Sequence, residues 1–325
     1  MKLFSPTLGR RLGEAVASAL DLPLGTLEER SFEDGEFKIR ALETVRRERV
    51  YVVQSLNGEA AAGAPEKLMR FLVLIGALKD AGAAEVTAVV PYLPFSRKDR
   101  QTQPRDPVTT RHVARLIEAA GADRAVTLDV HNLAAFQNAF RIPTDHLTAL
   151  TLFVEWVAER LGGRDLVVVS PDSGGVKRAE TLRIALAKRF GTEIPGAFAE
   201  KHRAKGEVSG EALVGPVEGR VALILDDMIA SGGTLARAAR ACLDHGATEA
   251  WAFATHGLFA EGAAETLDDD ALARVVVTDA CGPPRLPEAL VTRKLEIVPV
   301  AGLLAEAIRR IDTGGSIVDL LNPEA

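Results

Sequence analysis

The sequence predicts an α/β protein. Short runs rich in β-branched residues precede Gly-rich or polar turns and then stretches with helical spacing of apolar residues, which is typical of strands alternating with helices in a parallel sheet. A segment of the first half, Ala81-Gly82-Ala83-Ala84-Glu85, is echoed in the second half by His245-Gly246-Ala247-Thr248-Glu249. The chain has 325 residues, the length of two domains of about 150 residues each.

The individual elements follow from these patterns. The expected strands are residues 50–53, 85–90, 125–128, 166–169, 221–225, 250–254 and 275–277. The expected helices are residues 65–81, 108–120, 175–190, 234–245 and 303–311, of which the last four carry apolar residues three and four positions apart. Together they predict sheets that are mainly parallel and flanked by helices.

A second echo pairs Val126-Thr127-Leu128-Asp129 with Val276-Val277-Thr278-Asp279, an apolar strand that ends in an acid in both cases. Connections between helices and strands resemble one another in any such fold, so a single echo leaves open whether the two halves are related. Both echoes are explained by two similar domains that arose by duplication. We expect the boundary at residues 142–146, which gives domains 1–146 and 147–325.

The composition excludes several classes of protein. With 47% hydrophobic and 26% charged residues, the chain is ordinary for a globular protein. Its net charge of -6 and the lack of an extended basic run argue against a nucleic-acid partner. The first residues lack the apolar core of a signal peptide and no apolar stretch approaches about 20 residues, so we expect a cytoplasmic protein without membrane association. Cys242 and Cys281 stand far apart and predict buried small side chains rather than a disulfide or a zinc site.

The strongest feature is a phosphate-binding pattern. An apolar strand, residues 221–225, runs into Asp226-Asp227 and then into Ser231-Gly232-Gly233-Thr234 at the start of a helix. Glycines let backbone N–H groups approach an anion, the helix N-terminus adds its dipole, and Ser231 and Thr234 can donate hydroxyl hydrogen bonds. The pattern therefore predicts a phosphate cradle at the end of a strand.

The two adjacent acids need a separate explanation, because unpaired carboxylates repel and must be solvated or engaged. Asp226 and Asp227 suit a sugar diol, bound directly or through a metal ion. No Lys follows the glycines, so the segment is not the nucleotide-binding Walker loop. On these residues alone, an ordinary capped turn between a strand and a helix remains an alternative.

Read together, five segments resemble the ribose-phosphate diphosphokinase (phosphoribosyl diphosphate synthetase) family. They occur in family order over nearly the whole chain: Phe32 to Glu36, Pro91 to Arg100, Asp129-Val130-His131, Ser170 to Arg178 and the loop from Asp226 to Thr234. The resemblance implies two phosphoribosyltransferase-like domains, with ATP on the N-terminal side and ribose 5-phosphate on the C-terminal side. It also implies that the last residues of the chain pack back on the N-terminal domain.

The resemblance implies ATP-binding roles for two segments. Phe32, Asp34 and Glu36 match a loop in which the ring stacks on adenine and the acids bind the edge of the base. In the family this loop reaches into the ATP site of a neighbouring subunit, which implies a homo-oligomer, a dimer or a hexamer. A turn with an aromatic anchor is the alternative for these residues alone.

Arg97, Asp99 and Arg105 match the other ATP-binding stretch, in which guanidinium groups can bind triphosphate oxygens in pairs. Without the other segments, this stretch also fits an ordinary charged loop. Lys98 departs from the family pattern, which usually has Gln there.

The resemblance also assigns the metal and the catalytic loop. His131 and Asp172 match a Mg²⁺-associated pair, and a sparse set of ligands suits Mg²⁺ because this ion retains water and binds substrate phosphates. Lys201 and Arg203 match a catalytic loop that closes over the reacting phosphates, where cations stabilise the charge of the transition state. A structural histidine and a basic surface loop are the alternatives.

The expected reaction is transfer of the diphosphate of Mg-ATP to the 1-hydroxyl of ribose 5-phosphate. Asp226 and Asp227 would hold the ribose hydroxyls, and residues 231–234 the 5-phosphate. Ala230 stands where many members have an acid, and the sequence mixes features of the bacterial and plant-type branches. A phosphoribosyltransferase and a non-catalytic regulatory subunit are the alternative functions. The Phe32 and Arg97 segments argue against the first, and retention of Lys201, Arg203, His131 and Asp172 argues against the second.

Overall fold

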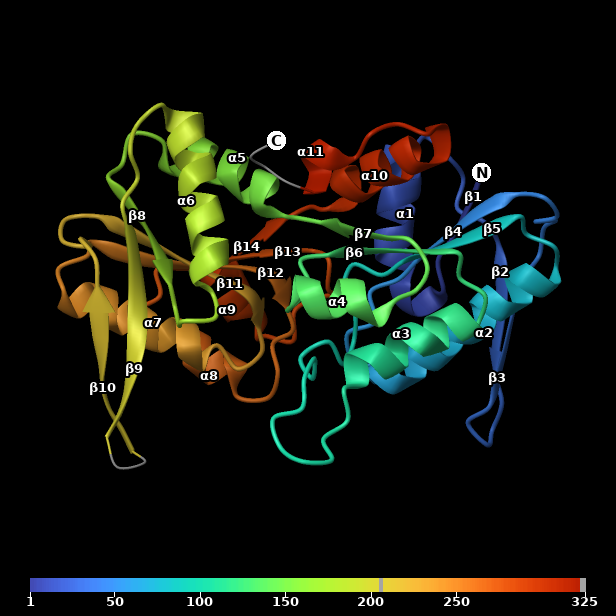
Figure 1. The fold of residues 1–325 in the computed structure, drawn as a ribbon, viewed down its shortest axis with the longest axis horizontal. Coiled ribbons are helices and arrows are strands. Elements are labelled where there is room, and N and C mark those ends of the chain that lie inside the picture. Colours follow the sequence, from blue (N-terminus) through green and yellow to red (C-terminus); the bar gives the residue numbers. More distant parts are fainter. Residues whose placement is uncertain (205–206, 322–325) are drawn as a thin grey trace. The chain divides into compact units, whose positions relative to one another are not determined.

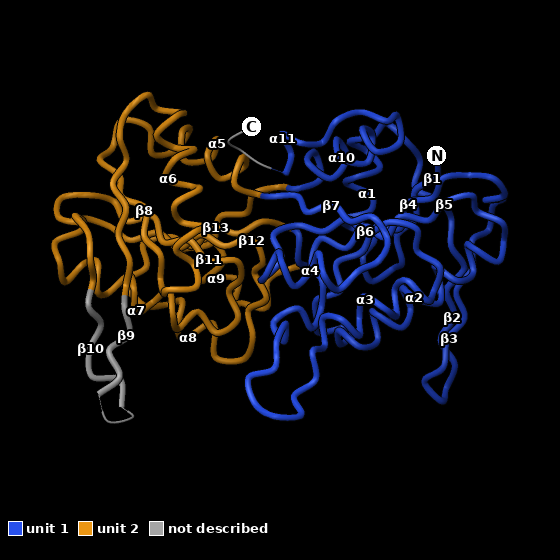
Figure 2. The backbone as a smooth tube through the Cα atoms, in the orientation of Figure 1, with its two compact units in different colours: residues 1–148, 280–282, 300–322 blue, residues 149–279, 283–299, 323–325 orange. Residues whose placement is uncertain are grey.

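The computed structural model describes the backbone of residues 1–204 and 207–321 and the side chains of residues 1–199 and 213–321. Its internal contacts divide the chain into two compact units, shown in blue and orange in Figure 2. Unit 1 comprises residues 1–148 and 280–282 and a last stretch that begins at Val300. Unit 2 comprises residues 149–279 and 283–299. The chain therefore passes between the units more than once.

Unit 1 is built on a five-stranded parallel sheet. The order across the sheet is β1 (Lys2–Phe4), β4 (Arg49–Val53), β5 (Glu85–Val89), β6 (Arg124–Leu128) and β7 (Thr144–Leu147). A 3-10 turn (Thr7–Gly9) and the helices α1 (Arg10–Ala19), α2 (Ala64–Asp80), α3 (Thr109–Ala119) and α4 (Leu133–Ala139) connect these strands (Figure 1). The core contains Phe4, Phe71, Leu74, Ile75 and Phe136.

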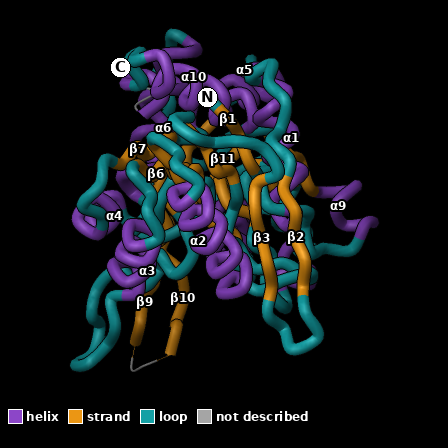
Figure 3. The backbone as a smooth tube through the Cα atoms, turned by 90° about the vertical axis from the view of Figure 1, so that its right-hand side faces the viewer, coloured by secondary structure: helices purple, strands orange, loops and turns teal. Residues whose placement is uncertain are grey.

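A two-stranded antiparallel hairpin also belongs to unit 1. It consists of β2 (Leu27–Ser31) and β3 (Phe37–Ala41), which lie side by side in Figure 3 and are joined by a short loop. The hairpin is inserted between the first two strands of the sheet. It places the segment from Phe32 to Glu36 at its tip.

Unit 2 contains a seven-stranded sheet. Its order is β10 (Glu207–Val214), β9 (Gly196–Ala204), β8 (Leu166–Ser170), β11 (Val221–Ile229), β12 (Glu249–Gly257), β13 (Arg274–Thr278) and β14 (Leu295–Val298). The β9–β10 pair is antiparallel and the other pairs are parallel. The helices are α5 (Leu150–Leu161), α6 (Val176–Phe190), α7 (Gly233–Asp244), α8 (Ala263–Leu267) and α9 (Glu288–Lys294). None of the described helices is long and apolar enough to cross a membrane.

The two units repeat one order of elements. In each, a first strand and helix (β1–α1 or β8–α6) are followed by a hairpin (β2–β3 or β9–β10) and then by four strands separated by helices. The five core strands also have the same order across the sheet in both units. This shared order explains the two sequence echoes, and the α/β class with parallel sheets flanked by helices is confirmed.

The helix that follows the last strand of each sheet packs in the other unit. α5 follows β7 but belongs to unit 2, where it packs against α6. α10 (Ala301–Thr313) follows β14 but belongs to unit 1, where it packs against α1. Each unit thus contains one helix that follows, in the chain, the last strand of the other unit's sheet.

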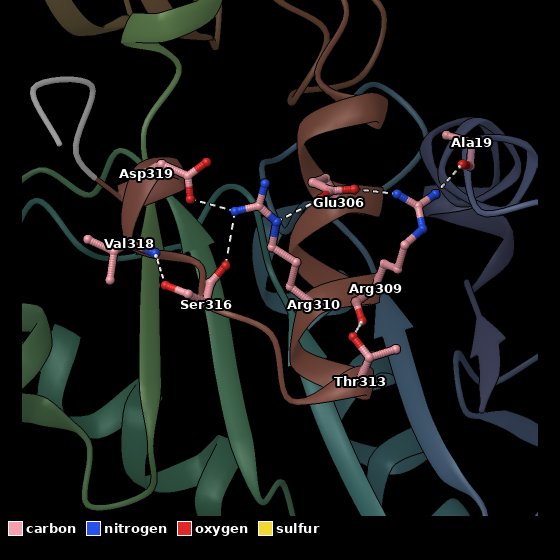
Figure 4. Close-up of polar contacts among 8 residues, drawn as sticks. All are labelled: Ala19, Glu306, Arg309, Arg310, Thr313, Ser316, Val318 and Asp319. Atoms are coloured by element: carbon pink, nitrogen blue, oxygen red, sulfur yellow. Dashed lines mark hydrogen bonds and ion pairs between the residues drawn. The ribbon is translucent and has the colours of Figure 1, made fainter.

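Polar contacts fix this last part of unit 1 (Figure 4). Arg309 donates through Nη2 to the carbonyl of Ala19, at 3.2 Å, at the end of α1. Arg310 contacts Glu306 and Asp319 and donates to the carbonyl of Ser316 at 2.9 Å. Arg310 therefore connects α10 to the short helix α11 (Val318–Leu321).

The predicted strands and helices are present, with ends that differ by up to four residues, and two differences concern the site. β11 continues beyond residue 225 to Ile229, because Asp226 and Met228 remain paired with Ala254 and His256 of the equally long β12. Residues 144–147, expected within a connection, form β7 because they pair with β6. The two hairpins were not predicted, since β2 is largely polar and lacks a clear alternation of apolar residues.

A buried polar cluster holds residues 280–282 in unit 1. Lys67 of α2 is fully buried and contacts the Glu59 carboxylate, and its Nζ lies 3.4 Å from the carbonyl of Ser55. Ser55 donates to the carbonyl of Ala280. A Cβ at Gly282 would lie 2.3 Å from Glu59, so only glycine fits there without displacing that side chain. Cys242 and Cys281 are both buried and form no disulfide, as predicted.

Removing one partner of the buried pair should destabilise unit 1. We expect Lys67→Ala to lower the free energy of unfolding by about 3 kcal/mol, because Glu59 then keeps a poorly solvated charge without its partner. Urea denaturation measures the change. The control, Lys38→Ala, removes an exposed pair with Glu28 and should cost less than about 1 kcal/mol. Equal losses of unfolding free energy in Lys67→Ala and Lys38→Ala would contradict the explanation by a buried pair. It would also be contradicted if the double variant Lys67→Met, Glu59→Gln recovered none of the lost stability.

Candidate functional site

In unit 2, the core strand β11 carries two acidic residues near its carboxyl end. Residues 221–225 of β11 are buried and apolar, and β11 then carries Asp226 and Asp227 in its last half. The side chain of Asp227 is only 5% exposed and that of Asp226 is 24% exposed, so both acids are largely removed from water. The Asp226 carboxylate accepts the backbone N–H of Asp227 at 2.8 Å. Ligands of parallel α/β sheets bind at the carboxyl ends of strands, which is where these acids lie.

Burial raises the pKa of Asp226 to about 7, and the neighbouring Asp227 carboxyl adds to the rise. The Arg178 guanidinium opposes it. A carboxyl with such a pKa changes charge near neutral pH, and perturbed groups of this kind gather at functional sites. The pair therefore marks a binding or catalytic site at the end of β11.

The predicted phosphate cradle follows these acids directly. Gly232 has a φ of +80° and forms the N-cap of α7. A Cβ there would lie 2.7 Å from Leu267 of α8, so both backbone conformation and packing require glycine. Ser231 is exposed and Thr234 lies in the first turn of α7. The segment thus offers backbone N–H groups and hydroxyls at a helix N-terminus, the arrangement that binds phosphate.

Arg237 is a cation that the sequence patterns did not single out. Its Nη2 donates to the Thr234 hydroxyl at 3.4 Å, and its Nη1 lies 3.3 Å from the position of a Cβ on Gly233. The guanidinium therefore lies beside the cradle. Arg237 follows Gly233 and Thr234 by about one helical turn, and this spacing could have predicted a side chain beside the start of α7.

A second segment of unit 2 reaches the same acids. Arg178, in the first turn of α6, places Nη1 3.4 Å from Asp226 Oδ1 and 3.8 Å from Asp227 Oδ1. The loop before α6 is held by Asp172, whose Oδ1 accepts the N–H groups of Gly174 at 2.9 Å and Gly175 at 3.1 Å. Arg178 belonged to a predicted motif, but its contact with the acids could be learned only from the packing of α6 beside β11.

In unit 1, two predicted ATP-side segments meet. The loop of Arg97, Asp99 and Arg105 follows β5, and His131 follows the adjacent strand β6. Asn132 donates to the Asp99 carboxylate at 2.6 Å and also caps α4 by accepting the N–H of Ala135. The structure therefore brings Asp99 beside the His131 segment.

The loop after β5 owes its shape to Lys98, the residue that departs from the family pattern. Lys98 contacts the Asp106 carboxylate and donates to the Thr102 hydroxyl at 2.8 Å. These hydrogen bonds hold the pKa of Asp106 well below its usual range. Lys98 thus closes the loop by bonding to its far end. Arg97 and Arg105 are exposed on this loop, and Arg105 has a left-handed φ of +72°.

The predicted adenine-contacting residues lie at the tip of the β2–β3 hairpin. Phe32, Asp34 and Glu36 are exposed, and the Phe32 ring is 41% exposed. Phe32 and Glu36 close the tip by a backbone hydrogen bond of 2.8 Å. The Arg30 guanidinium lies 5.1 Å from the centre of the Phe32 ring. The ring is therefore presented to solvent on a regular turn.

The predicted site residues fall into separate groups. Asp172, Asp226, Asp227 and residues 231–234 belong to unit 2, and the predicted ATP-side residues and His131 belong to unit 1. His131 and Asp172 belong to different units, and their pairing stays a prediction. Lys201 and Arg203 fall within β9, but their side chains lie outside the described residues.

Two family models match most of the chain. Residues 1–121 match the N-terminal domain of ribose phosphate pyrophosphokinase, and residues 193–322 match the phosphoribosyl synthetase-associated domain. The two matches include the Phe32 and Arg97 segments and the whole loop from Asp226 to Thr234.

Individual relatives match over nearly their full length. A ribose-phosphate pyrophosphokinase of Hyphomonas neptunium is 40% identical over 99% of this chain and 100% of its own length. One of Caldanaerobacter subterraneus is also 40% identical, over 98% of this chain and 97% of its own. The crystal structure of phosphoribosylpyrophosphate synthetase from Mycobacterium smegmatis is 34% identical and superposes with a TM-score of 0.86 over 97% of this chain and 99% of that one.

The ionisation of Asp226 can be measured directly. In protein labelled with ¹³C at aspartate carboxyls, we expect one carboxyl signal to titrate near pH 7 and to be absent from Asp226→Asn. Because the folded-state pKa lies above the unfolded value, the free energy of unfolding should fall as pH rises from about 4 to about 7, and this contribution should vanish in the variant. A signal that is assigned to Asp226 and titrates below about pH 5 would contradict the burial account.

Proposed function

The chain belongs to the ribose-phosphate pyrophosphokinase family, and we propose that its residues transfer the diphosphate of ATP to the 1-hydroxyl of ribose 5-phosphate. The products are 5-phosphoribosyl 1-diphosphate and AMP. The observation that carries the proposal is the continuous segment of β11 and α7, in which two buried acids adjoin a glycine cradle at a helix N-terminus.

The acids and the cradle suit opposite ends of the sugar phosphate. Ionised carboxylates accept hydrogen bonds from vicinal hydroxyls, which assigns the ribose diol to Asp226 and Asp227. The backbone N–H groups and hydroxyls of Ser231, Gly232, Gly233 and Thr234 bind the 5-phosphate. Arg237 adds a positive charge beside the same cradle.

Unit 1 supplies the ATP side in this proposal. Phe32, exposed at a hairpin tip, suits stacking on adenine, with Asp34 and Glu36 at the edge of the base. Arg97 and Arg105 suit the triphosphate, and Asp99 is held in place by Asn132. The exposure of Phe32 also supports a homo-oligomer in which the hairpin serves a neighbouring subunit. We place the reaction in the cytoplasm, where we expect both phosphorylated substrates.

His131 and Asp172 would hold Mg²⁺ together with ATP. Asp172 already uses Oδ1 to accept two backbone N–H groups, and no cluster of three or more potential ligands occurs among the described residues. Such a sparse set fits Mg²⁺, because substrate phosphates and water complete its shell. When bound, the ion neutralises triphosphate charge.

Catalysis then requires positioning and charge neutralisation rather than a covalent nucleophile. The 1-hydroxyl oxygen of ribose attacks the β-phosphorus of ATP and loses its proton, while the bond from the β-phosphorus to the α-phosphate oxygen breaks and AMP leaves. Lys201 and Arg203 would stabilise the negative charge that develops during this step.

Substitution of Lys201 tests the catalytic assignment. Wild-type protein given ribose 5-phosphate, ATP and Mg²⁺ should form AMP and phosphoribosyl diphosphate in equal amounts. Lys201→Ala should lower kcat by about 10²-fold or more, while calorimetric binding of ribose 5-phosphate changes little. Wild-type protein that forms no AMP would refute the proposed function, and loss of sugar binding in the variant would reassign Lys201.

Arg237 can be tested against a matched residue on the same helix. We expect Arg237→Ala to raise the KM for ribose 5-phosphate about tenfold, because a charge-assisted contact to the phosphate is lost, and to leave the KM for ATP unchanged. Arg240, three residues farther along α7, contacts Asp269 instead. Arg240→Ala should change neither constant by more than about twofold. Similar constants in the two variants would exclude Arg237 from the phosphate site.

A further inference from the structure

Two neighbouring carboxylates of one strand share a counter-ion. Asp226 and Asp227 follow each other on β11, and Arg178 lies within 4 Å of an Oδ1 atom of both. The three side chains are 24%, 5% and 22% exposed, so the cluster is largely shielded from solvent. In such surroundings the repulsion between two ionised acids is weakly screened, and a nearby cation has a strong effect on both.

Glycine packing brings Arg178 to this position. α6 begins directly after Gly175, and α6 contacts β11 (Figure 1). A Cβ at Gly175 would lie 2.8 Å from Ser170 Oγ and 3.7 Å from the carbonyl oxygen of Leu225, the residue before Asp226. The absence of a side chain therefore lets the start of α6 approach Ser170 at the end of β8, the strand that pairs with β11, and a Cβ would make only an ordinary contact with Leu225. Ser170 also donates to the carbonyl of Asp172 at 2.7 Å, which fixes the loop from the other side.

We propose that Arg178 is a positioning residue for ribose 5-phosphate, which holds the Asp226 and Asp227 carboxylates in the orientation that accepts the ribose hydroxyls. The inference rests on the proposed function and adds a residue from a different helix to its sugar site. Arg178 acts through the acids and is not itself assigned a contact with the substrate.

The chemistry of arginine explains why this residue type stands here. A guanidinium is planar and presents several N–H donors in a fixed fork, so it can contact two carboxylates at once. A lysine ammonium is a point charge and would favour one acid over the other. In the proposed function both acids accept hydrogen bonds from the sugar diol, so both orientations matter. A lysine should therefore replace Arg178 only in part.

Steady-state kinetics of three variants test the inference. We expect Arg178→Ala to raise the KM for ribose 5-phosphate about tenfold or more and to leave the KM for ATP within about twofold of wild type. Arg178→Lys should give an intermediate KM. The matched control is Lys177→Ala, which removes the exposed cation next in the chain and should change neither constant. An unchanged KM for ribose 5-phosphate in Arg178→Ala, or an equal rise for both substrates, would overturn the assignment.

A double-variant cycle separates positioning from a general structural role. If Arg178 acts through the acids, Arg178→Ala should raise the KM of Asp226→Asn by a smaller factor than it raises the wild-type KM, because one of the two groups that it orients is gone. Multiplying effects would show independent roles and refute the inference. Should Arg178→Ala fail to fold, the cycle is run with Arg178→Lys and read by the same criterion.

Binding measurements distinguish failure of this inference from failure of the proposed function. Calorimetry with ribose 5-phosphate alone requires no turnover. If wild type binds the sugar but forms no AMP, the proposed reaction fails while weaker binding by Arg178→Ala still supports the inference. Equal binding by wild type and Arg178→Ala overturns the inference alone. No binding by wild type overturns both.

Discussion

The site depends on the parallel pairing of β11 with β8 and β12. This pairing brings the carboxyl ends of the three strands to one edge of the sheet, where polar groups can collect without interrupting the buried apolar part of each strand. β11 shows the division along its own length, with buried apolar residues up to Leu225 and two acids immediately after them. The cost of burying these acids is lowered by Arg178, which the adjacent helix α6 supplies.

The sequence allowed the β11 segment to be predicted because its signals are local. Apolar β-branched residues, adjacent acids and a glycine pair before a helix all occur within fourteen positions, from Val221 to Thr234. Residues that act across elements could not be assigned in the same way. Arg178 lies almost fifty positions before the acids, and its contact depends on how α6 packs beside β11. Arg237 could be assigned to the phosphate cradle only once the direction of its side chain on α7 was known.

Lys98 shows how a departure from a family pattern can have a structural cause. In the sequence, a lysine in place of glutamine raises a question about nucleotide selectivity. In the structure, its ammonium group contacts Asp106 and Thr102 and closes the loop that carries Arg97 and Arg105. The neighbouring residue Asp99 is fixed separately by Asn132. The shape of this loop is therefore set by side-chain contacts within the loop and with Asn132, which follows β6. These contacts could not be predicted from the residue types alone.

The exchange of α5 and α10 between the units has a consequence for synthesis on the ribosome. α1, whose buried residues include Leu12 and Val16, precedes the second sheet in the chain. The helix that packs against it, α10, begins only at Ala301. Translation proceeds towards the C-terminus, so unit 1 cannot acquire its complete set of contacts until α10 has been made, after all the strands of the second sheet. Unit 1 therefore begins before unit 2 in the chain but is completed after it, and α1 lacks its contacts with α10 while the second sheet is made.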